Sequence, residues 1–249
     1  MNLNLDGKIA LVTGGASGIG ACIAEALADE GCIVYIGDIN LEAAQDVGRS
    51  LGANAHAMRM DVSNPEGVQT TVEQIAKKTG GLDILINNAG ILRTESLMES
   101  TIEDWDRISK INLSSVYYCS KAVLPIMRKK RYGKIVNMSS ISAMKGGGTF
   151  GNVLYGTTKA GVVAMTKGFA RELAPFGINV NAIAPAVTET AMTNELIAGE
   201  LRERLLAGCP MRRFARASEV ASLALFLVSD VSGYITGETI VIDGGRLTN

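Results

Sequence analysis

The sequence predicts a doubly wound α/β fold, in which residues 1–249 form a single domain built on a seven-stranded parallel sheet with helices on both faces. The first observation behind this prediction is that short β-branched runs alternate with longer segments of helical apolar spacing along the whole chain. The second is that 249 residues, 47% of them hydrophobic, suffice for one large core without a second domain.

Seven short segments have the length and composition of strands: residues 8–13, 32–37, 54–60, 83–88, 133–139, 177–183 and 238–243. Between them, apolar residues recur at helical spacing in segments 18–30, 41–51, 65–79, 102–130 and 154–174. Two long irregular stretches remain, at about 140–153 and 185–216. Loops of such length in a compact domain usually carry function, so we expect both to flank a substrate.

Composition argues against several classes of function. The 24 Lys and Arg residues balance 25 Asp and Glu residues, so no global positive field attracts nucleic acid or anionic lipid. No apolar run approaches the ~20 residues that span a bilayer, and the first residues lack the basic region of a signal peptide, so we expect a cytoplasmic protein.

The four cysteines lie far apart without a histidine cluster, which predicts no metal site. The single histidine, His56, lies on a predicted strand, which argues against a Ser–His triad.

A glycine-rich turn, TGGASGIG, follows the first predicted strand, and helical spacing begins directly after it. Such a turn presents backbone N–H groups and a helix N-terminus at one place, which is a site for a pyrophosphate. The strict G-x-G-x-x-G spacing is absent, and a glycine turn alone also occurs without a ligand. The residues that we expect to bind the cofactor here are Gly14, Ser17, Gly18, Ile19 and Gly20.

The second predicted strand is followed by Asp38, about 18 residues beyond Gly20. A carboxylate there accepts hydrogen bonds from the adenine-side ribose hydroxyls and repels a 2′-phosphate. We expect Asp38 and the next residue, Ile39, to contact the cofactor. No Lys or Arg lies in the glycine turn, at Ile39 or at Asn40 to bind such a phosphate, so we predict NAD rather than NADP. Asn40 is the better candidate than Asp38 for the cap of the helix at 41–51.

The third and fourth predicted strands also deliver small or polar residues to the carboxyl edge of the sheet, where open α/β sheets bind ligands. We expect five of these residues to contact the cofactor: Asp61, Val62, Asn88, Ala89 and Gly90.

Further motifs occur in a recognisable order: TGGASGIG, Asp61-Val62, NNAG at 87–90, INLSSVYYCSKA around Asn112, NMSS at 137–140, YGTTK at 155–159 and ITGETIVIDGG near the end. Their order and approximate spacing resemble the short-chain dehydrogenase/reductase family over essentially the whole chain. The resemblance implies a Rossmann fold, a nicotinamide cofactor, and hydride transfer between nicotinamide and a small-molecule alcohol or ketone.

Tyr155 and Lys159 are four residues apart at the start of a helical segment, so their side chains share one face. A cation held close to a phenol lowers its pKa by roughly 1–3 units, towards the range in which acid–base catalysis is effective. The resemblance implies that Tyr155 transfers the proton. It also implies that Lys159, together with the positively charged nicotinamide, lowers the pKa of Tyr155, and that Lys159 binds the nicotinamide ribose.

The same resemblance implies two further catalytic residues. Ser140, which closes NMSS, hydrogen-bonds the substrate oxygen, and Asn112 holds a water that connects Lys159 to solvent. Counting back from Tyr155 by the family's usual separation reaches Ser142 instead, because the intervening loop is slightly longer. Ser142 is therefore an alternative, or a loop residue within reach of substrate.

The segment after the sixth predicted strand resembles the family segment that binds the nicotinamide carboxamide, through Pro185, Thr188 and Thr190. Ala186 stands where the family usually has glycine. Glycine tolerates a positive φ and alanine does not, so the local backbone geometry is in question.

For the substrate, the stretch GGGTFGNVLYGTTKAG resembles family members that oxidise polyols, sugars or sugar acids of the gluconate type, and NAD suits oxidation. The first alternative is a 3-oxoacyl- or steroid-type carbonyl reductase, although acyl reductases more often use NADP. A non-catalytic NAD-binding regulator is the alternative from another class, and it would be expected to lack Tyr155, Lys159 or Ser140.

Two points concern the surface. Arg212 and Arg213 either meet an anionic substrate group or lie in solvent or at a subunit contact. The C-terminal ITGETIVIDGG and the segments 102–130 and 154–174 resemble the elements that family members pack against neighbouring subunits, which predicts a homotetramer.

Overall fold

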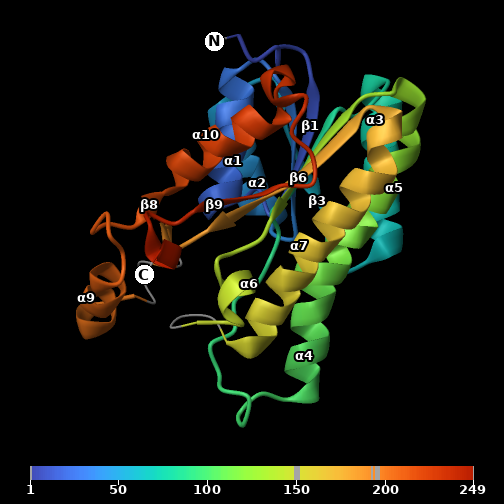
Figure 1. The fold of residues 1–249 in the computed structure, drawn as a ribbon. Coiled ribbons are helices and arrows are strands. Elements are labelled where there is room, and N and C mark those ends of the chain that lie inside the picture. Colours follow the sequence, from blue (N-terminus) through green and yellow to red (C-terminus); the bar gives the residue numbers. More distant parts are fainter. Residues whose placement is uncertain (1, 149–151, 192, 194–196, 249) are drawn as a thin grey trace.

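The computed structural model describes residues 2–148, 152–191, 193 and 197–248. Seven strands form one sheet in the order β3-β2-β1-β4-β5-β6-β9, and every neighbouring pair is parallel (Figure 1). They are β1 (Ile9–Thr13), β2 (Ile33–Asp38), β3 (Ala55–Arg59), β4 (Ile84–Asn87), β5 (Gly133–Met138), β6 (Ile178–Pro185) and β9 (Thr239–Ile242). The chain moves outward from β1 to β3 and then returns to place β4 on the other side of β1. The switch point therefore lies beyond the carboxyl ends of β1 and β4.

Helices cover both faces of the sheet (Figure 1). On one face lie α1 (Gly18–Asp29), α2 (Leu41–Leu51) and α10 (Ala217–Val228); on the other lie α3 (Pro65–Thr79), α5 (Ser115–Lys130) and α7 (Val153–Leu173). Successive side chains of β1 point to opposite faces of the sheet, so the strand contributes to the hydrophobic core on both sides. Ala10 and Val12 belong to the core on the α1 side, and Leu11 belongs to the core on the α5 side. Among the described residues, no helix combines the length and apolar content that crossing a bilayer requires.

The predicted doubly wound sheet is confirmed, and each predicted strand is present with ends that differ by at most two residues. Local signals explain the helix boundaries. The side chain of Asn40 caps α2 by accepting from the Ala43 N–H, as predicted, and Asn64 caps α3 in the same way. The Gly80 C-cap ends α3 in the left-handed conformation.

Three predictions of secondary structure need correction. The segment 102–130 is divided into α4 (Ile102–Ser109), a π-helical turn η1 (Lys110–Ser114) and α5. Helix α10 was not predicted, because its sequence ASEVASLALFLV is apolar almost throughout and lacks amphipathic spacing. The two stretches predicted as irregular contain short regular elements: α6 (Ser142–Lys145), β7 (Thr188–Glu189), α9 (Gly199–Ala207) and β8 (Ala215–Arg216). Residues 149–151, 192 and 194–196 of those stretches lie outside the described residues.

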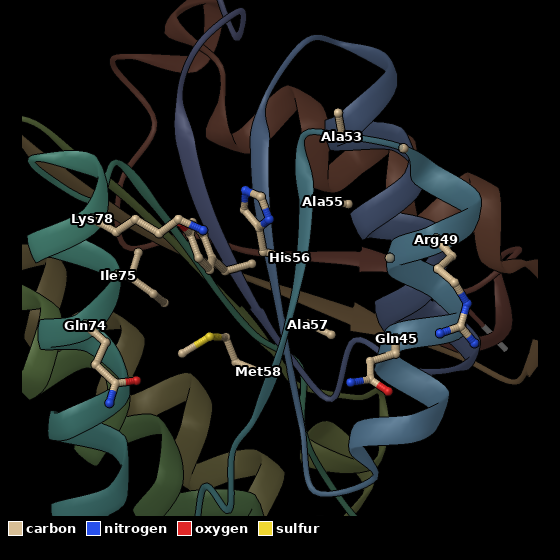
Figure 2. A pocket seen from close by; sticks show the side chains of 13 residues that line it. Gln45, Arg49, Ala53, Ala55, His56, Ala57, Met58, Gln74, Ile75 and Lys78 are labelled. Carbon is tan, nitrogen blue, oxygen red and sulfur yellow. The ribbon is translucent and has the colours of Figure 1, made fainter.

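The β3 edge of the sheet borders a groove of about 740 Å³, flanked by α2 and α3 (Figure 2). His56 lies in this groove against the Tyr35 ring, with 5.0 Å between ring centroids. Burial and the nearby Lys78 ammonium lower the pKa of His56, so the imidazole is a neutral packed group. It is not among the residues that line the cleft described next.

Candidate active site

A cleft of about 630 Å³ opens along the carboxyl edge of the sheet, at the switch point between β1 and β4. The predicted site residues that line it are Gly14, Ser17, Gly18, Ile19, Asp38, Ile39, Asp61, Val62, Asn88, Ala89, Gly90, Ser140, Tyr155, Lys159, Pro185, Thr188 and Thr190. Gly20 and Asn112 are buried and do not line it. Segments distant in sequence thus converge here because their strands end at one edge.

The glycine turn after β1 is shaped by close backbone approach. Gly14 has a φ of +62°, and a Cβ on Gly20 would lie 2.1 Å from the Gly14 carbonyl oxygen and 2.5 Å from Asn88 Nδ2. Asn88 Nδ2 donates to the carbonyls of Thr13 (3.1 Å) and Gly14 (2.9 Å). The Asn88 side chain therefore braces the turn, and only glycine fits at position 20.

The N-terminus of α1 fits a pyrophosphate. Ser17 occupies the N-cap position without a side-chain capping bond, and the first turn of α1 contains no acidic residue. Ser17, Gly18 and Ile19 line the cleft, so their backbone faces the ligand space where a helix N-terminus favours an anion. A Cβ on Gly18 would lie 3.3 Å from Thr190 Cγ2, so a bare glycine keeps this part of the cleft open.

Asp38 lies at the end of the cleft beside the glycine turn and is fixed there by two backbone hydrogen bonds. Its Oδ2 accepts from the Ala16 N–H (3.1 Å) and its Oδ1 accepts from the Asn40 N–H (3.0 Å). The carboxylate of Asp61 is used differently, since it accepts from both the N–H and the hydroxyl of Ser63. Of the two predicted carboxylates, Asp38 is the one whose placement beside the glycine turn suits a ribose.

The segment after β6 accommodates alanine without strain. Ala186 is not among the described non-glycine residues with positive φ, and its N–H donates to the Ile242 carbonyl at 3.0 Å. The Thr188 hydroxyl donates to the Ala186 carbonyl (3.2 Å), and the Thr190 hydroxyl lies 3.1 Å from that of Thr193. The departure from the family's glycine therefore leaves this wall of the cleft in regular geometry.

Lys159 and Tyr155 lie on the same face of α7, next to the end of β5. Lys159 is 5% exposed, its Nζ donates to the Met138 carbonyl (2.8 Å), and it lies 5.7 Å from the centre of the Tyr155 ring. Burial lowers the pKa of Lys159 to about 8, because desolvation disfavours the charged form.

The lowering of the Tyr155 pKa by Lys159 together with a positively charged nicotinamide stays a prediction, and other groups dominate this pKa in the chain alone. Burial raises the pKa of Tyr155, and a hydrogen bond with Ser140 acts in the opposite direction without overcoming it. The ammonium of Lys159 is bonded to the Met138 carbonyl, so it makes no direct contact with the phenol. The phenol therefore keeps its proton at neutral pH.

Ser140 and Ser142 both line the cleft, but only the Ser140 hydroxyl acts on the pKa of Tyr155, which it lowers against the larger effect of burial. The Ser140 hydroxyl also accepts from the Ser142 N–H at 3.1 Å, which fixes its position. Ser142 belongs to the short helix α6 that follows. This geometry favours Ser140 as the partner of Tyr155.

Asn112 lies in the π-helical turn, and its side chain is fully engaged away from the cleft. Oδ1 accepts from the Ile91 N–H (2.8 Å), and Nδ2 donates to the Ile91 carbonyl (2.9 Å) and the Thr158 hydroxyl (3.4 Å). The water-holding role expected of Asn112 stays a prediction, and this side-chain amide is already committed to Ile91.

Some lining residues were missed by the sequence analysis. Ile91 and Leu92 directly follow the NNAG motif, and this adjacency could have identified them as cleft residues. Lys145 belongs to α6 and Arg246 to the C-terminal segment, and no sequence motif marks either residue. Arg212 and Arg213 do not line this cleft. Arg213 instead donates two hydrogen bonds of 2.7 Å to Glu219.

A parallel sheet with an anion-binding glycine turn, a fixed acidic residue after β2, and a half-buried Tyr155 beside a buried Lys159 at the same edge defines the class of dinucleotide-dependent oxidoreductases. Comparison with known proteins gives the family. The model described as Enoyl-(Acyl carrier protein) reductase matches residues 14–246. The chain belongs to the short-chain dehydrogenase/reductase family, and it is an oxidoreductase that uses a nicotinamide cofactor and acts on a CH–OH or carbonyl group.

Relatives of similar length match over nearly the whole chain. The 3-oxoacyl-(acyl-carrier-protein) reductase of Escherichia coli (strain K12) is 42% identical, and that of Vibrio cholerae serotype O1 is 44% identical, each over 98% of both chains. Among solved structures, gox2181 superposes with a TM-score of 0.97 at 35% identity, covering 100% of this chain and 98% of the other. A short-chain type dehydrogenase/reductase from Mycobacterium marinum gives 0.95 at 32% identity, with the same coverage.

Proposed function

We propose that the chain is an NAD(H)-dependent reductase of 3-oxoacyl thioesters. The relatives that match it at 39–44% identity over 98% of its length carry the name 3-oxoacyl-(acyl-carrier-protein) reductase. This favours the alternative over the polyol, sugar or sugar-acid substrate that the loop before Tyr155 suggested. Tyr155 lines the cleft, where its phenol can supply the proton that a carbonyl oxygen needs in reduction.

The placement of Ser140 and Tyr155 in the lining of one cleft is the observation that carries the mechanism. Both side chains line the cleft, so one carbonyl oxygen can accept a hydrogen bond from each. Tyr155 transfers its proton to that oxygen, and Ser140 stabilises the negative charge that develops on it. The bound nicotinamide supplies the hydride. Lys159 holds a positive charge close to the phenolate that remains.

Asp38 supports NAD as the cofactor. Its carboxylate is held beside the glycine turn by Ala16 and Asn40, where it would meet the ribose and repel a 2′-phosphate. Gly14, Ser17 and Ile39, which line the same end of the cleft, carry no positive charge.

Oxidation of a polyol, sugar or sugar acid is the second candidate, because the preference for NAD that Asp38 implies suits the oxidative direction. A steroid-type ketone would use the same proton donor. A regulator without catalysis is disfavoured, since Ser140, Tyr155 and Lys159 all line one cleft.

A substrate panel decides among these candidates. The purified protein would be assayed by NADH absorbance with 3-oxoacyl thioesters in reduction, and with polyols and sugar acids in oxidation, each with NAD(H) and NADP(H). The proposal expects the highest kcat/KM for a 3-oxoacyl thioester with NADH. Activity confined to polyols or sugar acids would establish the second candidate instead.

We also propose a homotetramer. The segments with family resemblance present exposed apolar side chains, including Tyr117 on α5, Val153 on α7 and Val241 on the edge strand β9. Buried contact with a second copy would cover such surface. Sedimentation at micromolar concentration is expected to show a tetramer, and a monomer would contradict the proposal.

A further inference from the structure

The segment 91–95, which follows the NNAG motif, is held at both ends by asparagine side chains. Its first residues, Ile91 and Leu92, line the cleft. Asn112 binds both the N–H and the carbonyl of Ile91, at 2.8 and 2.9 Å. This pair of bonds joins the beginning of the segment to the π-helical turn.

Asn152 holds the other end of the segment. Its backbone N–H donates to the Arg93 carbonyl (3.0 Å), and its Nδ2 donates to the Glu95 carbonyl (2.7 Å). Its Oδ1 accepts from the Tyr155 N–H at 3.0 Å and so caps α7. One half-buried residue therefore connects the segment with the helical turn that carries the proton donor.

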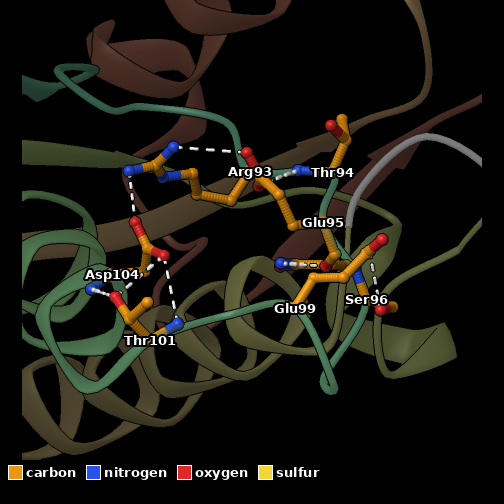
Figure 3. A network of polar contacts seen from close by, with 8 residues as sticks. Arg93, Thr94, Glu95, Ser96, Glu99, Thr101 and Asp104 are labelled. Atoms are coloured by element: carbon orange, nitrogen blue, oxygen red, sulfur yellow. Dashed lines mark hydrogen bonds and ion pairs between the residues drawn. The ribbon is translucent and has the colours of Figure 1, made fainter.

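The Arg93 side chain fixes the position of the segment 91–95 through ion pairs (Figure 3). It forms ion pairs with Glu95 and with Asp104 of α4. Asp104 and Thr101 form a capping box at the start of α4. Asn152 is thus bonded to a segment that α4 and the turn at Asn112 also hold, and Asn112 itself donates to Thr158 of α7.

Tyr155 needs such an anchor because it lies in the first turn of α7, where backbone N–H groups lack partners within the helix. Proton transfer is sensitive to misplacement of the donor by about 1 Å, which can cost ~10²-fold in rate. We propose that Asn152 is a positioning residue for Tyr155, which ties the first turn of α7 to the Arg93 and Glu95 carbonyls. This inference rests on the proposed role of Tyr155 in proton transfer.

Asn152 could instead serve only to stabilise α7 as its N-cap. One substitution separates this purely structural role from the positioning of Tyr155. Asn152→Asp keeps an oxygen that caps α7, since Asp and Asn are equivalent caps. It replaces the Nδ2 donor with an oxygen that faces the Glu95 carbonyl, so the side-chain bond to Glu95 is lost while the backbone N–H of residue 152 still donates to the Arg93 carbonyl. Asn64→Asp is the matched control, because Asn64 caps α3 through Oδ1 and does not line the cleft.

Kinetics of the two variants give the first readout. Asn152→Asp is expected to lower kcat roughly tenfold or more. The KM for NADH and the midpoint of thermal unfolding should stay close to those of the wild type. Asn64→Asp should leave kcat unchanged. Wild-type kcat in Asn152→Asp would overturn the inference, and so would a fall in kcat matched by an equal fall in Asn64→Asp.

Hydrogen–deuterium exchange gives a readout that requires no activity. Amides of residues 91–96 should exchange faster in Asn152→Asp than in the wild type, while α7 stays protected by its retained cap. Unchanged exchange over 91–96 would overturn the tether. If the wild-type protein reduced no substrate of the panel, the proposed function would fail while exchange still decided whether Asn152 holds this segment. An active wild type with an equally active Asn152→Asp would refute the positioning role alone.

Discussion

The ammonium nitrogen of Lys159 lies 5.7 Å from the centre of the Tyr155 ring and donates its hydrogen bond to the Met138 carbonyl. The lysine therefore acts on the phenol by the electrostatic effect of its charge and without a direct hydrogen bond. Its position on the same face of α7 keeps that charge close to Tyr155. Because the cleft wall is desolvated, even this separation leaves a substantial interaction with a phenolate. The protonation state of Lys159 then becomes part of the reaction.

A pH dependence follows from the burial of Lys159. Its pKa is lowered from 10.5 to about 8, so the ammonium is present below pH 8 and is lost as the pH rises through that value. The rate of reduction should be level below this pH and fall above it. In Lys159→Arg the guanidinium keeps its charge, so any residual activity should lack this falling limb. If the rate fell at the same pH in the wild type and in Lys159→Arg, the fall would have to be assigned to another titrating group.

Asp38 should control the choice of cofactor. In the wild type, the Kd for NADPH is expected to exceed the Kd for NADH, because the carboxylate repels a 2′-phosphate. Asp38→Ala removes that charge and should reduce the NADH preference by roughly tenfold, equivalent to ~1.4 kcal/mol. Fluorescence titration with both cofactors measures this. Equal affinity of the wild type for the two would contradict the assignment of NAD.

The glycine turn should tolerate no added side chain. In Gly20→Ala the new Cβ would lie 2.1 Å from the Gly14 carbonyl oxygen, and relieving this clash should cost about 1–3 kcal/mol of unfolding free energy and weaken cofactor binding. Gly48→Ala is the matched control within α2, where the nearest atoms lie at 3.8 Å. It should stabilise the protein by ~0.5–1 kcal/mol. Urea unfolding compares the two, and equal shifts would refute the steric account.

The strands and most of the cleft were predictable from sequence because they depend on local signals. Seven short segments, six of them with β-branched residues, became seven strands, and parallel strands that share one edge gather their terminal residues there. The N-cap role of Asn40 was predictable for the same reason, since capping involves only the next few residues.

Features that depend on tertiary contact escaped prediction. The π-helical turn at Asn112 has no sequence signature. The Asn112 side chain makes a pair of hydrogen bonds to the Ile91 backbone, and this tertiary contact is visible only in the structure. Helix α10 is largely apolar because it packs against both α1 and the strands β5 and β6, and such a helix shows only weak hydrophobic periodicity. The raised pKa of Tyr155 depends on burial, which the spacing to Lys159 does not report.

Replacing Tyr155 by Phe tests the central claim most directly, because it removes one hydroxyl and leaves the aromatic ring in place. NADH oxidation with a 3-oxoacyl thioester would be measured for the wild type and for Tyr155→Phe, alongside NADH binding to each. The proposed mechanism predicts a loss of turnover of roughly 10²–10⁴-fold with nearly unchanged NADH affinity. Turnover of Tyr155→Phe close to that of the wild type would contradict the assignment of Tyr155 as proton donor.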